Sequence, residues 1–62
     1  MKNPEPALLD VSAAADYLAV KVSYVRRMVR ERRIPFVKIG ALVRFERAEL
    51  DSLIESGRRD AR

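Results

Sequence analysis

Apolar residues recur with helical spacing in the first part of the chain. Val11, Ala14, Ala15 and Leu18 stand at positions i, i+3, i+4 and i+7, and Asp10 before them is a good N-cap residue. This pattern predicts a short helix that begins at residue 11. The alanines within it indicate close packing against another helix.

A second stretch has a similar spacing and then stops. Its apolar residues at i, i+3, i+6 and i+7 are Val22, Val25, Met28 and Val29. They predict a helix over residues 22–32, joined to the first by a tight connection at Ala19–Val20, with Ser23 as a candidate cap. Pro35 blocks continuation of this helix and biases Ile34 toward extended geometry.

The segment Phe36–Phe45 is typical of a β-hairpin, with Gly40 in its middle. A loop of two residues would give the pairs Lys38–Val43 and Val37–Arg44. A loop of three residues would give the pairs Ile39–Val43 and Val37–Phe45. The second register creates one apolar face and places Lys38 beside Arg44 on the other face. Because burial of one face specifies register strongly, we expect the loop of three residues.

A final helix is predicted over residues 47–56, where Leu50, Leu53 and Ile54 offer an apolar side and Gly57 is a candidate stop. These side chains join the apolar residues of the earlier elements in one predicted core. That core consists of Val11, Ala14, Tyr17, Leu18, Val25, Met28, Val29, Val37, Ile39, Val43, Phe45, Leu50, Leu53 and Ile54.

The order helix, turn, helix, hairpin and helix describes a small α+β fold of the winged helix-turn-helix type. We expect a single domain at residues 8–56. A flexible N-terminal arm at residues 1–7 precedes it, and a polar C-terminal tail at residues 57–62 follows it.

Positive charge is concentrated in the second predicted helix. The chain has 13 Lys and Arg against 9 Asp and Glu, a net charge of +4. Residues 20–33 alone hold six basic residues and one acidic residue, a net charge of +5, so all other residues sum to −1. This concentration favours an anionic partner.

Several function classes are excluded by residue types that the chain lacks. Without cysteine or histidine it has no disulfide, no thiolate zinc site and no histidine base or ligand. The carboxylates are scattered, so we expect no catalytic activity, no metal or other cofactor and no small-molecule ligand. No apolar run approaches the roughly 20 residues that span a bilayer, and no signal-peptide pattern is present, so we expect a cytoplasmic protein without membrane contact.

The polar side of the second helix carries the candidate DNA-binding residues. Arginine side chains can contact phosphates or guanine edges, so we expect this helix to enter the major groove of double-stranded DNA. Lys21 is unfavourable for the helix dipole, which suggests a phosphate contact, and Lys38 and Arg44 of the hairpin would contact flanking phosphates. The complete predicted set is Lys21, Ser23, Tyr24, Arg26, Arg27, Arg30, Lys38 and Arg44.

Each of these features also has a simpler interpretation. The arginines can form an ordinary solvated face, and Tyr24 can pack against the hairpin. Lys38 and Arg44 can be exposed strand charges without a ligand. Leu42 at the hairpin tip is either a peripheral core residue or an apolar contact to a neighbouring copy.

An ordered set of short motifs resembles the small excisionase-type DNA-binding domains, which are related to the MerR-type winged helices. The matching motifs are Leu9-Asp10-Val11, Ala14-Ala15, Tyr17-Leu18, Val20, Ser23-Tyr24-Val25-Arg26-Arg27-Met28-Val29-Arg30, Ile34-Pro35, Val37-Lys38-Ile39-Gly40, Val43-Arg44-Phe45 and Glu49-Leu50-Asp51. The resemblance covers about residues 8–55. In this family a glycine often stands at the turn, where this chain has Ala19, and before the Ile-Pro pair, where it has Arg32 or Arg33.

The resemblance implies an excisionase, meaning a recombination directionality factor. Such a protein bends DNA near the attachment site of a phage or integrative element and helps a site-specific integrase to assemble. It would bind double-stranded DNA of the nucleoid as several copies of itself on adjacent sites.

Two alternatives remain open. One is a small MerR-like transcriptional regulator, although the short chain favours an architectural factor. The other is a basic amphipathic helix for membranes or acidic proteins, which Pro35 and the hairpin argue against.

Overall fold

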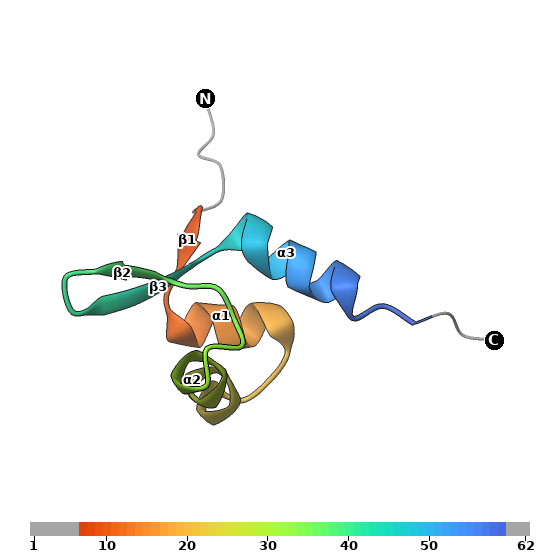
Figure 1. Ribbon diagram of the computed structural model, residues 1–62, viewed down its shortest axis with the longest axis horizontal. Coiled ribbons are helices and arrows are strands. Elements are labelled where there is room, and N and C mark those ends of the chain that lie inside the picture. The colour runs from red at the N-terminus through yellow and green to blue at the C-terminus, as the bar shows by residue number, and fades with distance from the viewer. Residues whose placement is uncertain (1–6, 60–62) are drawn as a thin grey trace.

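The computed structural model describes residues 7–59 as three helices and three strands (Figure 1). Their order is β1 (Leu8–Leu9), α1 (Val11–Leu18), α2 (Val22–Arg30), β2 (Val37–Ile39), β3 (Leu42–Glu46) and α3 (Arg47–Ser56). The strands form an antiparallel sheet in the order β1-β3-β2, and the β2–β3 hairpin projects away from the helices. The predicted winged helix-turn-helix fold is confirmed. Most of the predicted arm, residues 1–6, and residues 60–62 of the tail lie outside the described residues.

Helix α1 begins as its sequence predicts. The backbone N–H of Ala13 donates a hydrogen bond to Oδ1 of Asp10 at 2.8 Å, so Asp10 is the N-cap. Ala14 and Ala15 are buried on its inner side, where their small side chains let α2 and the sheet approach closely. The interpretation of the alanine run as a packing surface is therefore confirmed.

Helix α2 begins at Val22 as predicted, but its cap and its end differ from the prediction. Lys21 occupies the N-cap position without a side-chain hydrogen bond, and Ser23 lies inside the first turn. The helix ends at Arg30, two residues early, because the chain adopts a left-handed conformation at Arg32. The N–H of Arg33 then donates to the carbonyl of Met28 at 2.8 Å. This closure is a Schellman motif, in which glycine is the usual left-handed residue.

Helix α1 closes in the same way, with Ala19 at a φ of 59° and Arg32 of α2 at 57°. A left-handed conformation costs a residue with a Cβ about 1–2 kcal/mol, a cost that glycine avoids. Glycine loses more backbone entropy on folding, so a substitution by glycine gains only part of that energy. We therefore expect Ala19→Gly and Arg32→Gly each to stabilise the fold by about 0.5–1 kcal/mol. Thermal unfolding followed by circular dichroism should show midpoints raised by roughly 2–8 °C.

Ala48→Gly is the matched control, because Ala48 is an exposed residue inside α3. Glycine there should lower stability by about 0.5–1 kcal/mol. Equal destabilisation of the Ala19 and Ala48 variants would contradict the assignment of strain to the two helix ends.

The expected hairpin register is wrong. The pairs in the structure are Val37–Arg44, Lys38–Val43 and Ile39–Leu42, which leaves a loop of two residues. Gly40 has a φ of 63° and the φ of Ala41 is not positive, as a type II′ turn with glycine first requires. Turn chemistry decides the register because the tip extends past the helices and no face is buried there. Consequently Lys38 and Arg44 lie on opposite faces of the hairpin instead of side by side.

The core lies between α1, α2, α3 and the base of the sheet. Its fully buried members are Ala14, Ala15, Val25, Ile34, Phe45 and Leu50. Three residues predicted for the core are exposed instead, namely Tyr17, Ile39 and Ile54. Ile34 and the short strand β1 were missed, because a single residue before a proline and a strand of two residues show no periodicity.

Tyr17 joins α1 to α3 through a polar contact at the surface. Its hydroxyl donates a hydrogen bond to Oδ1 of Asp51 at 2.5 Å. This bond raises the pKa of Tyr17 above its ordinary value of 10. Because the pKa of Tyr17 is raised in the folded state, the hydrogen bond stabilises the fold fully at neutral pH. This stabilisation is lost as the pH rises from 10 through the raised pKa of the folded state.

Candidate nucleic-acid interface

The outer side of α2 forms a shallow polar hollow. Val25 is buried beneath the helix and Met28 and Val29 are half-buried, so the remaining positions face outward. The hollow is lined by Lys21, Ser23, Tyr24, Arg27 and Arg30, all of which are exposed. These five residues are called the α2 surface below.

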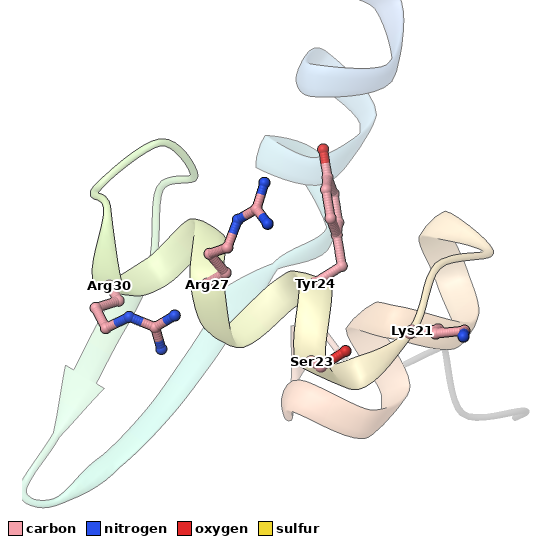
Figure 2. Close-up of a pocket in the computed structure, with 5 residues that line it drawn as sticks. All are labelled: Lys21, Ser23, Tyr24, Arg27 and Arg30. Carbon is pink, nitrogen blue, oxygen red and sulfur yellow. The ribbon is translucent and has the colours of Figure 1, made fainter.

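The five side chains of the α2 surface are spread along the helix (Figure 2). Lys21 lies at the N-terminal end and Arg30 at the C-terminal end, a span of roughly 14 Å at 1.5 Å per residue. A helix with its side chains is about 10–12 Å in diameter, which matches the roughly 12 Å width of the major groove of B-DNA. Tyr24 and Arg27, three residues apart, point to the same side of the helix. The α2 surface therefore offers hydroxyl and guanidinium donors at its centre and positive charges at both ends.

Glu31 sets the local electrostatics of the α2 surface. Its carboxylate lies 3.7 Å from Nε of Arg27 and 3.4 Å from Nη1 of Arg33. All three side chains are well exposed, so each pair contributes little to stability. Glu31 is nevertheless the only carboxylate within residues 20–33, and it neutralises part of the charge that an anionic ligand would meet.

We expect Glu31→Gln to strengthen binding to duplex DNA at low salt by roughly two- to fivefold, because it removes a repelling charge and releases Arg27. Filter binding at about 50 mM salt would measure the change. Glu55→Gln is the matched control, because Glu55 forms a similar exposed pair with Arg58 after α3. An equal gain in both variants would mean that only net charge matters.

A second basic hollow lies between α1, α2 and the edge of β3. Arg26 and Arg44 line it, together with Asp10 and Ser12 at the start of α1. Nη1 of Arg44 donates to the carbonyl of Val43 at 2.8 Å, so the guanidinium folds around the strand edge toward the helices. This surface is called the Arg26–Arg44 hollow below. Ser12 was not predicted, and its only signal is its position in the first turn of a helix.

The two basic surfaces meet at Arg30. This residue lines the α2 surface and also a neighbouring hollow that it shares with Arg26 and Val43. Lys38 pairs with Val43, so it lies on the helix-facing side of the hairpin and is exposed. The expectation that Lys38 lies beside Arg44 is therefore wrong. The other predicted site residues lie on connected surfaces.

Negative charge lies on α3 and its N-cap, and α1 separates α3 from α2 (Figure 1). Residues 46–56 hold Glu46, Glu49, Asp51 and Glu55 against Arg47. The α2 side is therefore basic and the α3 side acidic, a distribution that orients the protein toward a polyanion.

Other site types find little support in the part of the chain that the structure describes. Among residues 7–59, no group of three or more carboxylates could hold a metal ion. Within the same range, no helix has the length and apolar character needed to cross a bilayer.

The comparisons with known proteins agree with this geometry. A family model described as helix-turn-helix domain matches residues 8–58, which is most of the chain. Searches of curated proteins and of solved structures give no match. Members of the matched family typically bind DNA and are typically not enzymes. The chain therefore belongs to the helix-turn-helix domain family of excisionase-like DNA-binding proteins.

Proposed function

We propose that this chain is an architectural DNA-binding protein that acts as a recombination directionality factor with a site-specific integrase. The observation that carries the proposal is the α2 surface, where five exposed polar or basic side chains line one hollow along the helix. The membership in an excisionase-like family supports the recombination role. The acidic α3 side remains available for protein partners, since it faces away from the DNA.

The proposed docking assigns a role to each predicted residue. Helix α2 enters the major groove, where Ser23, Tyr24 and Arg27 meet base edges near the centre of the contact. The remaining basic residues contact phosphates on the two sides of the groove. These phosphate contacts are Lys21, Arg26, Arg30, Lys38 and Arg44.

The proposed assembly contains several copies of the chain on adjacent DNA sites of the nucleoid. A small contact between copies is weak in free solution but becomes effective when neighbouring sites raise the local concentration. Sedimentation of the free protein should therefore give a monomer at micromolar concentration. Binding per site should be tighter on duplexes with several sites than on a duplex with one.

Footprinting on fragments of the source genome tests the proposal directly. We expect the wild-type protein to protect adjacent sites beside a recombination attachment site. Arg27→Ala should weaken protection by roughly 5- to 150-fold, the equivalent of 1–3 kcal/mol for a base contact. Lys38→Ala should instead weaken the binding of cognate and of scrambled duplexes by similar factors, because phosphate contacts carry no sequence information.

The position of the footprints distinguishes the two candidate functions. Protected sites at promoters, without an attachment site nearby, would support the small MerR-like transcriptional regulator. Unchanged cognate affinity for a folded Arg27→Ala variant would contradict the docking of α2 itself.

A further inference from the structure

The tip of the β2–β3 hairpin is apolar. Ile39 and Leu42 form the last cross-strand pair before the turn, and Gly40 and Ala41 close it. Their exposed fractions are 50% and 53%, the highest among the large hydrophobic residues that the structure describes. Because the two residues are paired across the strands, their side chains lie on the same face and form one continuous apolar knob.

The hairpin that carries this knob is basic, although Asp10 of the α1 N-cap lines the hollow that Leu42 and Arg44 share. Residues 36–45 contain Lys38 and Arg44 and no carboxylate. Lys38 starts from one face of the hairpin and Arg44 from the other, and the guanidinium of Arg44 folds around the strand edge toward the helices. The hairpin also projects past the helices, so the tip reaches beyond the body of the molecule (Figure 1). An apolar knob beside two basic side chains suits a partner that combines apolar surface with negative charge.

The minor groove of DNA has these properties. Phosphates line its two walls, stacked bases form its floor, and its width is about 6 Å. A pair of strands is wider than this groove, so only the side chains at the hairpin tip can enter it. Apolar side chains that enter this groove separate neighbouring base pairs and kink the duplex.

We propose that Ile39 and Leu42 insert as an apolar wedge between two base pairs of the minor groove, next to the major groove that α2 occupies. The inference rests on the proposed function, and it names the residues that deform the DNA. Lys38 and Arg44 then contact phosphates beside the point of insertion. The binding of α2 selects the site, and the wedge bends it.

A single-site duplex of about 30 base pairs, selected from a random library with the wild-type protein, tests this proposal. Fluorophores at its ends report bending, and 2-aminopurine placed in turn at each flanking step reports unstacking. The wild-type protein should shorten the end-to-end distance and raise 2-aminopurine fluorescence several-fold at one step. The double variant Ile39→Ser with Leu42→Ser should lose both signals and about tenfold in affinity.

Ile54→Ser is the matched control, because Ile54 is an exposed apolar residue of α3 on the acidic side. It should bend and unstack the duplex like the wild-type protein, and circular dichroism should confirm that all variants fold. Full bending and unstacking by the double variant would overturn the wedge. So would a loss confined to cooperative binding on duplexes with two sites, which would assign the knob to a second copy. If the wild-type protein selected no duplex, the proposed function itself would fail.

Discussion

Phe45→Ala is expected to abolish the cooperative unfolding transition of this protein. Phe45 has no exposed surface, and it lies in β3, the central strand of the sheet, opposite Leu9 of β1. Replacing a buried phenylalanine by alanine costs about 3–5 kcal/mol through lost transfer energy and the cavity that remains. A chain of 62 residues has a total stability of only about 3–9 kcal/mol. The substitution therefore removes much or all of the free energy that keeps the chain folded.

Phe36→Ala provides a matched control, since the chain contains just two phenylalanines and Phe36 is only half-buried. It should cost about 1–2 kcal/mol and keep a cooperative transition at a lower midpoint. Circular dichroism during thermal unfolding would compare the two variants. A Phe45→Ala midpoint within a few degrees of the wild-type value would show that the core does not depend on this ring.

The helices were predictable because their burial is periodic. Helix α3 has the predicted bounds, and α1 begins at the predicted residue behind its Asp10 cap. Helix α2 ends early because Arg32 turns left-handed, a conformation that residue types indicate only when glycine is present. The resemblance to a family with glycine near these positions was the one signal for both helix ends.

The hairpin was harder to predict because local and long-range effects compete there. Alternation of apolar residues favoured a loop of three residues, which would have put Ile39 on a buried face. The type II′ geometry at Gly40 overrides that pattern, because the tip has no helix to cover it. Ile34 shows the reverse case, in which a loop residue becomes fully buried through contacts that are distant in sequence.

Part of the candidate site follows from the spacing of residues in the sequence, and part depends on how the elements pack in three dimensions. The α2 surface follows from helical spacing alone, and the structure brings Lys21, Ser23, Tyr24, Arg27 and Arg30 together. The Arg26–Arg44 hollow could not be predicted, since it depends on which way the hairpin faces and on the edge of β3.

Affinity for duplex DNA is expected to fall by roughly 500-fold when salt rises from about 50 to 200 mM. The α2 surface, the Arg26–Arg44 hollow and Lys38 together neutralise about five phosphates in the proposed docking. Each neutralised phosphate releases condensed counterions, so the logarithm of the association constant should fall with the logarithm of salt with a slope of roughly −4 to −5. Fluorescence anisotropy on a labelled duplex over a salt series would measure this slope.

The salt slopes of single variants show which basic residues contact phosphates. Arg26→Gln and Arg44→Gln should each make the slope less steep by about one, because each removes one phosphate contact. Arg58→Gln removes the same charge beyond α3, where Arg58 pairs with Glu55, and should leave the slope unchanged. A wild-type slope near zero would contradict the electrostatic docking. Equal changes for Arg44→Gln and Arg58→Gln would instead show that net charge governs binding, and that the Arg26–Arg44 hollow has no specific role.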